Sequence, residues 1–93
     1  MTLSALVRVH GVRGLAFSVT RAAAQAPVTI RVYSLAGRLI RVLVNERLAP
    51  GVYEIGWDGL DESGRRAAPG VYLAVMSAGS FRATQRLILK HAS

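Results

Sequence analysis

The acidic residues of this 93-residue chain are unevenly placed: three of the five fall within five positions of the segment WDGLDESGRRAAPGVY, residues 57–72. They are Asp58, Asp61 and Glu62. Neighbouring carboxylates are candidate calcium ligands, but a loop of the EF-hand type needs oxygen ligands at its first and last positions. Alignment on the loop glycine places Gly59 and Gly70 there, and neither offers a side-chain ligand. Because Arg65 and Arg66 follow within four residues of Glu62 and would largely neutralise such a site, the three acids are weak calcium candidates, and we predict no bound metal.

Paired carboxylates also perform acid–base chemistry, so we tested the run for a hydrolase site. Glu54 and Asp58 share one face of a predicted strand, but they are about 13 Å apart at roughly 3.3 Å per residue, too far for a glycosidase pair. His10 and His91 lie near opposite ends of the chain and match no metal-ligand or triad spacing. There is no phosphate-binding glycine loop, nucleophile motif or zinc-binding helix motif. The sequence therefore predicts neither an enzyme nor a cofactor.

Turn chemistry explains the acidic run better. Asp58 follows Trp57, and its carboxylate is expected to accept a backbone N–H at that corner. Residues 61–64, DESG, are typical of a type I turn that ends on a glycine in the left-handed conformation. Trp57, the largest side chain of the chain, is expected to anchor the core.

The elements that must position these residues are strands, because apolar and polar residues alternate with period 2 and no helical spacing is present. The predicted strands are 15–20, 28–33, 38–44, 51–58, 71–78 and 81–90, with a weaker one at 5–9. In 38–44 the alternation places Ile40, Val42 and Val44 inward and Arg41 on the opposite face. The segment 71–78 is apolar on both faces, as in the middle of a sheet.

Turn signals separate these strands every eight to twelve residues. The sequence Pro-Gly-Val-Tyr occurs at 50–53 and again at 69–72. We interpret it as one strand-entry device used twice, with each Pro-Gly pair forming a type II turn. Gly37, Gly64 and Gly79 are expected to supply positive φ. The predicted turn residues are Gly37, Pro50, Gly51, Gly59, Gly64, Pro69 and Gly70. The predicted core anchors are Trp57, Tyr53, Tyr72, Ile55, Ile30 and Val32.

About seven short strands with regular turns and no helix predict an all-β fold, an antiparallel immunoglobulin-like (fibronectin III-like) β-sandwich. A small barrel is the competing fold. The chain has no cysteine, so the sandwich would lack a disulfide. We expect residues 1–14 to be an N-terminal extension or extra strand, and residues 15–93 to be the sandwich domain.

Charge and apolar content bear on partners. The net charge of +7 favours an anionic polymer, such as nucleic acid or an acidic glycan, as one alternative. No specific nucleic-acid readout is expected, because only 6% of residues are aromatic. The apolar fraction of 52% favours contact with another protein or self-assembly through sheet edges. The candidate interaction residues are Leu39, Leu43, Val71, Leu73, Val75, Arg31, Arg41, Arg82 and Arg86. No run of 18 apolar residues could span a membrane, and no convincing signal peptide is present.

Residues 15–90 resemble the FlgD-type immunoglobulin-like domain and are similar to the C-terminal sorting domains of type IX secretion cargo. The specific motifs are WDG-x-D-x-x-GR, here residues 57–65, and the paired glycine–valine–tyrosine strand starts. Positions that match the family pattern are Tyr33, Gly37, Arg38, Arg41, Leu43, Gly51, Tyr53, Trp57, Asp58, Gly59, Asp61, Gly64, Arg65, Gly70, Val71, Tyr72 and Leu87–Lys90. The chain departs from the pattern in lacking the NPFNP entry and in carrying Ser34 where aspartate is common.

The resemblance implies a non-catalytic structural or protein-interaction module of a bacterial exported or cell-surface protein. Its expected partners are its parent chain, the export machinery or a second copy of itself. A flagellar hook-cap-like assembly scaffold is the other role that the resemblance implies.

Overall fold

The computed structural model describes residues 2–9, 12–21 and 26–90 and contains seven strands in these ranges. They are β1 (Thr2–Val9), β2 (Val12–Val19), β3 (Val28–Ser34), β4 (Leu39–Glu46), β5 (Gly51–Trp57), β6 (Gly70–Ala78) and β7 (Phe81–Leu89). The described part of the chain contains no apolar helix of membrane-spanning length. β1 pairs with β2, and the boundary expected after residue 14 falls inside β2.

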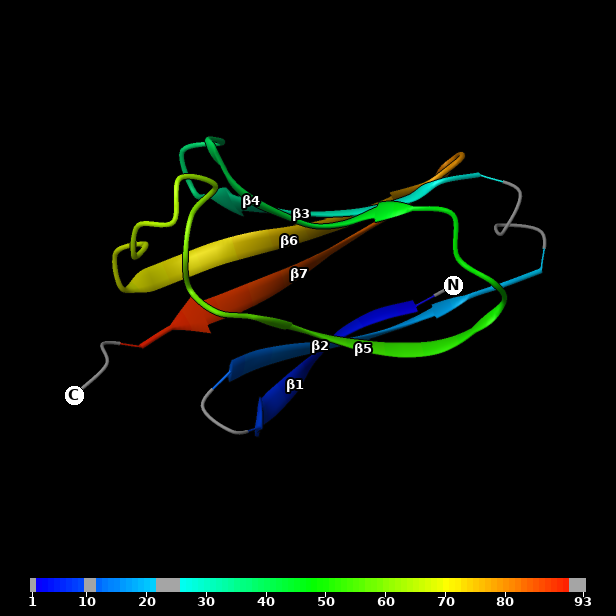
Figure 1. Cartoon of the computed structure of the whole chain (residues 1–93), viewed down its shortest axis with the longest axis horizontal. Helices are drawn as coiled ribbons and strands as arrows, with labels where there is room; N and C mark the ends of the chain where they lie inside the picture. The colour runs from blue at the N-terminus through cyan, green and yellow to red at the C-terminus, as the bar shows by residue number, and fades with distance from the viewer. Residues whose placement is uncertain (1, 10–11, 22–25, 91–93) are drawn as a thin grey trace.

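Two antiparallel sheets pack face to face (Figure 1). One has the strand order β1-β2-β5 and the other the order β4-β3-β6-β7. β1 lies against β7 on one side of the molecule. On the other side, β4 and β5 are the edge strands, and the chain passes from β5 to β6 there through residues 58–69. The predicted immunoglobulin-like β-sandwich without a disulfide is confirmed.

The core forms where the predicted alternation points. β2 and β3 bury every second side chain between the sheets, and so does β6, the strand that runs through the middle of the larger sheet. The buried apolar residues are Leu15, Phe17, Val19, Val28, Ile30, Val32, Val44, Trp57, Tyr72, Ala74, Met76, Ala78 and Leu87. Full burial of one large aliphatic side chain contributes about 1.5–3 kcal/mol. Four of the predicted anchors are in this core, while Tyr53 and Ile55 are partly buried against it.

β4 departs from the predicted alternation. Ile30 pairs with Val44 but Arg31 pairs with Val42, so one residue of β4 is inserted, and a second insertion follows at Ile40. Such bulges turn the residues after them onto the other face of the sheet. Arg41, opposite the buried Val32, therefore lies on the inner side of the sheet, while Val42 lies on the outer side.

The two Pro-Gly-Val-Tyr segments have the same local structure. The hydroxyl of Tyr53 donates to the carbonyl of Ala49, and that of Tyr72 to the carbonyl of Ala68, in each case four residues upstream. This resembles the tyrosine corner of β-sandwiches. The prediction of type II turns is wrong, because the glycines after the two prolines have φ of 159° and 152° rather than about +80°.

Each of these tyrosines also packs on a second aromatic ring. Tyr53 stacks on Phe17 with ring centroids 5.2 Å apart. Tyr72 meets Trp57 edge to face at 5.1 Å. The repeated segment thus ties the start of β5 and the start of β6 to the core.

Candidate functional site: a sheet face and the loop that closes the sandwich edge

The aspartates of the acidic run accept hydrogen bonds from backbone N–H groups of their own loop. Oδ1 of Asp58 accepts the N–H of Leu60 at 3.0 Å. Oδ1 of Asp61 accepts the Ser63 hydroxyl at 2.7 Å and the N–H groups of Ser63 and Arg65 at 2.9 and 3.0 Å. The hydrogen bond from the Ser63 hydroxyl, with that from the Arg65 N–H, holds the pKa of Asp61 below its ordinary value. These carboxylates stabilise a turn, which the N–H of Gly64 closes onto the Asp61 carbonyl at 3.0 Å.

Glu62 attaches this loop to the edge of the larger sheet. Its backbone N–H donates to the carbonyl of Ile40 at 2.9 Å, and its carboxylate accepts the N–H of Val42 at 2.7 Å. One residue thereby satisfies a donor and an acceptor of β4 that face away from β3. The middle of the β4 edge is consequently covered by the protein's own chain.

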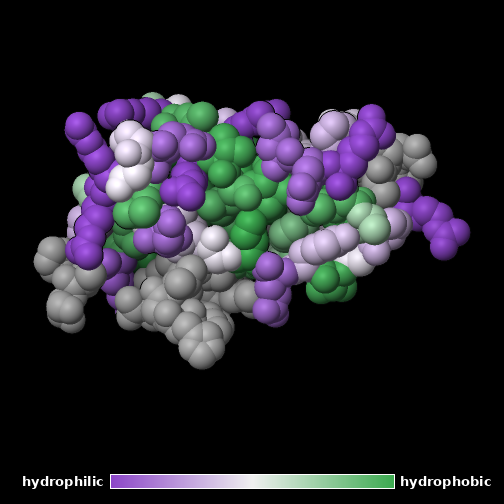
Figure 2. Space-filling view, in the orientation of Figure 1, coloured by the Kyte–Doolittle hydropathy of each residue, from purple (hydrophilic) through white to green (hydrophobic). Residues whose placement is uncertain are grey.

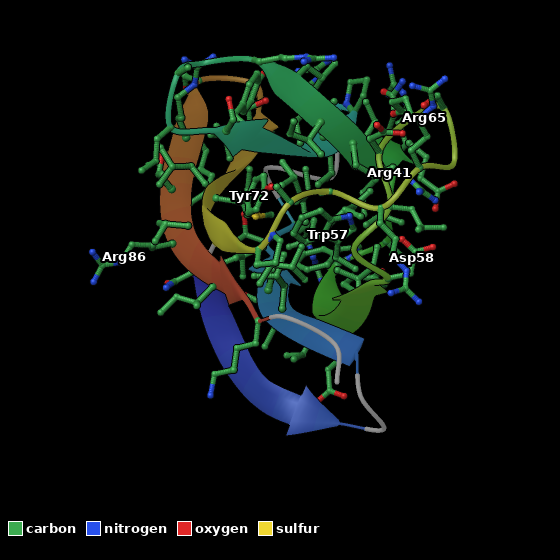
Figure 3. All side chains as sticks on the ribbon, turned by 90° about the vertical axis from the view of Figure 1, so that its left-hand side faces the viewer. Arg41, Trp57, Asp58, Arg65, Tyr72 and Arg86 are labelled. Carbon is green, nitrogen blue, oxygen red and sulfur yellow. The ribbon has the colours of Figure 1, made fainter. Side chains whose placement is uncertain are left out.

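Arg41 of β4 contacts the same loop through its side chain. Nη1 of Arg41 lies 3.5 Å from Oδ1 of Asp58 and 3.4 Å from each of the carbonyl oxygens of Leu60 and Asp61. Trp57 donates its Nε1–H to the same Leu60 carbonyl at 3.0 Å. Figure 3 shows Arg41 of β4 and Asp58 beyond β5 on the same side of the sandwich. The two side chains are 30% and 50% exposed, so the ion pair itself contributes little, about 0–1 kcal/mol.

A groove of about 400 Å³ runs beside this loop. Its lining includes Arg38, Arg66, Asp61 and Glu62, together with the ring of Tyr72. The two acids already accept backbone N–H groups, and within the described residues no three His, Cys, Asp or Glu side chains converge as metal ligands would. The weak calcium candidates thus occupy a structural loop.

The outer face of the larger sheet, defined here as the side turned away from the core, gathers most of the predicted interaction residues. Cross-strand pairing aligns Leu39, Tyr33, Leu73 and Arg86 in one row and Val42, Arg31, Val75 and Thr84 in the next. Val71 pairs with Ile88 at one end of this face, and Ser77 with Arg82 at the other. Leu39 and Ile88 are 42% and 50% exposed, which is high for aliphatic side chains on a sheet. Four strands thus contribute to one surface that is apolar and basic.

Two predicted interaction residues lie elsewhere. Leu43 packs against the core, and Arg41 reaches the loop after β5, because of the bulges in β4. Val42 and Ile88 complete the outer face but were not among the predicted interaction residues, and Tyr33 adds an aromatic ring to it. Period-2 alternation through Arg82 and Arg86 would have identified Ile88 from the sequence.

The side of the sandwich where the edge strands β4 and β5 of the two sheets lie is also apolar. Figure 2 shows apolar side chains gathered in a band across this region. Ile40, Leu43, Tyr53 and Ile55 pack there against the core without being fully buried. At the start of β5, Val52 is 82% exposed.

The fold and these surfaces define a small β-sandwich of the immunoglobulin-like class. Its acidic loop residues stabilise a turn, and apolar side chains outside the core lie on two of its surfaces. The chain belongs to the FlgD Ig-like domain family, whose model matches residues 5–80. The predicted resemblance to this family is confirmed, whereas the likeness to sorting domains stays a prediction. The family is one of structural, non-enzymatic modules related to the flagellar hook cap. No match was found among curated proteins or among solved structures.

Proposed function

We propose that this domain is a non-catalytic protein-interaction module of a bacterial exported or cell-surface assembly, and that the outer face of the larger sheet is its contact surface. Membership of the FlgD Ig-like family supports the structural role. The observation that carries the choice of surface is that β4, β6 and β7 place Leu39, Leu73, Val75 and Ile88 on the same face of one sheet.

A hydrogen-bonded sheet is a favourable platform for such a contact. Its side chains stand on a backbone that is already ordered, so binding costs little additional conformational entropy. Apolar area removed from water contributes about 25 cal/mol per Å². Scaffolding of a flagellar hook-cap-like assembly is the role we favour, and a sorting-type role in export is the alternative. The partner would then be the parent chain or a component of the assembly.

Site-specific photocrosslinking in the bacterium that encodes the chain tests this function. A photoreactive amino acid replaces Ile88 on the outer face or, as the matched control, the exposed aliphatic Val52 on the other sheet. We expect position 88 to give a discrete adduct with a protein of different sequence and position 52 to give none; an adduct of position 52 with a second copy of this chain would belong to the self-association described below. Adducts of equal yield at both positions, or none at position 88, would refute the outer face as the contact surface.

Self-association through a sheet edge is a second form of this function, favoured by the edge between β4 and β5. Glu62 covers the middle of β4, whereas β5 pairs with β2 alone among the described strands and lies beside the apolar band. A second copy could add its own strand to β5. Size-exclusion chromatography with light scattering should then show oligomers that increase with concentration and that Val52→Lys weakens. A monomer at every concentration would exclude this form.

A further inference from the structure

We infer that the outer face of the larger sheet recognises a protein segment that presents acidic and apolar side chains together on one side. This inference rests on the proposed function, because it names the chemistry of the partner for the same surface. Its basis is a fixed pattern of three arginines among aliphatic side chains. The three are Arg31 on β3 and Arg82 and Arg86 on β7.

The arginines form a triangle with Val75 inside it and Leu73 beside Arg86. Arg82 and Arg86 are four residues apart on one strand, about 13 Å. Arg31 aligns with Val75 and Thr84, so its row lies midway between the rows of Arg82 and Arg86. It is two strands away from β7, about 10 Å across the sheet. In Figure 3, Arg86 projects from β7 away from the sandwich.

This positive charge is not balanced by the protein's own acids. None of the residues that β3, β4, β6 and β7 place on the outer face is acidic. Asp58, Asp61 and Glu62 are held in the loop at the sandwich edge. Glu54 is on the smaller sheet, and Glu46 pairs with the buried Val28 at the end of β4. A complementary partner must therefore bring carboxylates of its own.

The apolar residues distinguish a protein from a polyanion as the partner. A nucleic acid or acidic glycan would match the arginines but would leave Leu39, Leu73 and Ile88 without apolar contact. Nucleic-acid binding on a sheet also relies on aromatic stacking. Phe81 packs against the core, which leaves Tyr33 as the aromatic residue of this face.

A second copy of the chain fits the face poorly. Each copy carries a net charge of +7, and its acids are placed or engaged as described above. Like charge on two copies opposes the approach of one face to another. Charge complementarity therefore selects a partner of different sequence.

Three synthetic peptides of equal length test the inference by fluorescence anisotropy at about 0.15 M salt. In each peptide Ser occupies every second position, so that the residues between the serines share one side of an extended chain. These residues are Glu and Val in turn in the first peptide, Lys and Val in turn in the second, and Glu and Ser in turn in the third. We expect the Glu/Val peptide to bind the intact domain at least about tenfold more tightly than either of the others. The double variant Arg31→Glu, Arg86→Glu should reverse the preference and bind the Lys/Val peptide.

The matched control is Arg38→Glu, Arg66→Glu, which changes two exposed arginines of the groove beside the loop by the same total charge. It should keep the preference for Glu/Val. Circular dichroism verifies that each variant is folded. A reversed preference in this control would mean that net charge, and not the outer face, selects the peptide.

Four further outcomes overturn the inference. Glu/Ser peptide or heparin that binds as tightly as Glu/Val would show a general polyanion site. An unchanged preference in the Arg31→Glu, Arg86→Glu variant would exclude these arginines. Absence of binding to all three peptides would exclude this partner chemistry. If the chain self-associates, and if Ile88→Glu abolishes this self-association while Val52→Glu does not, the partner is a second copy of the chain. If photocrosslinking at position 88 still gives a discrete protein adduct, any of these results refutes the partner chemistry alone and not the proposed function.

Discussion

The carboxylate of Glu62 accepts the backbone N–H of Val42 at 2.7 Å, while the Glu62 N–H donates to the neighbouring Ile40 carbonyl. A loop residue therefore presents to β4 the donor and the acceptor that an adjacent strand would present. An uncovered strand edge is a template for unwanted pairing. The acidic run after Trp57 thus protects an edge, and this role leads to the first prediction.

Glu62→Ala should lower the free energy of unfolding by about 1 kcal/mol, because one backbone hydrogen bond loses its acceptor, and should increase aggregation. Glu62→Gln keeps an acceptor oxygen and should change both quantities much less. Urea unfolding and light scattering measure the two effects. Glu54→Ala, on the exposed side of β5, is the control and should be nearly neutral. Equal effects of the substitutions at 62 and 54 would show that the edge contact contributes nothing.

The two tyrosine corners should differ in stability. Tyr72→Phe removes a partly buried hydrogen bond to Ala68 and should cost about 1–1.5 kcal/mol. Tyr53→Phe removes an exposed bond of the same geometry and should cost about half as much. Both variants keep their aromatic packing. Chemical denaturation followed by the fluorescence of Trp57 compares them, and a larger loss for Tyr53→Phe would contradict the role of burial.

Alanine substitutions at Gly59 and Gly37 distinguish the destabilisation caused by steric crowding from that caused by backbone strain. Both have positive φ, 80° and 88°, so alanine should cost about 1 kcal/mol at either position for the strained backbone. A Cβ at Gly59 would also lie 3.3 Å from Cδ1 of Leu89, whereas one at Gly37 meets no atom within 4 Å. Gly59→Ala should therefore lower the melting temperature more than Gly37→Ala. Equal shifts would show that the Leu89 side chain moves aside freely.

Asp61 should make stability depend on pH in the acidic range. The Ser63 hydroxyl and the Arg65 N–H lower its pKa in the folded state, so the folded state binds fewer protons than the unfolded state as pH falls. The contribution is therefore fully present above the unfolded pKa, near 3.9, and is lost as pH falls through the lower folded pKa. Asp61→Asn should flatten this part of the curve of unfolding free energy against pH. A slope as steep in Asp61→Asn as in the unchanged domain would assign the effect to other groups.

Much of the fold was predictable because its determinants are local. Alternation in β2 and β3 identified the buried side of each strand, and Gly37, Gly64 and Gly79 have the predicted positive φ of 88°, 85° and 58°. Trp57 was recognisable as an anchor from its size. The turn at 61–64 was recognisable because aspartate, serine and glycine favour that conformation within a few residues.

The bulges of β4 were not predictable from alternation. The pattern RLIRVLV is compatible with a regular strand, and only the pairing with β3 shows which residues are inserted. That shift decides that Arg41 reaches the loop after β5 and that Val42 joins the outer face. The partners of the two tyrosine hydroxyls likewise depended on the backbone path around each proline.

By itself, the sequence determined the strands, the positions of their turns, the family and the excess of positive charge, since these depend on residue type and short-range spacing. The tertiary structure decided which charges are compensated and which are left over. It brings Glu62 to the edge of β4 and Asp58 to Arg41, and it leaves Arg31, Arg82 and Arg86 on one face with Val75 between them. The physical reason is that sheet register and the packing of two sheets are set by contacts between residues far apart in the chain, which no local pattern contains.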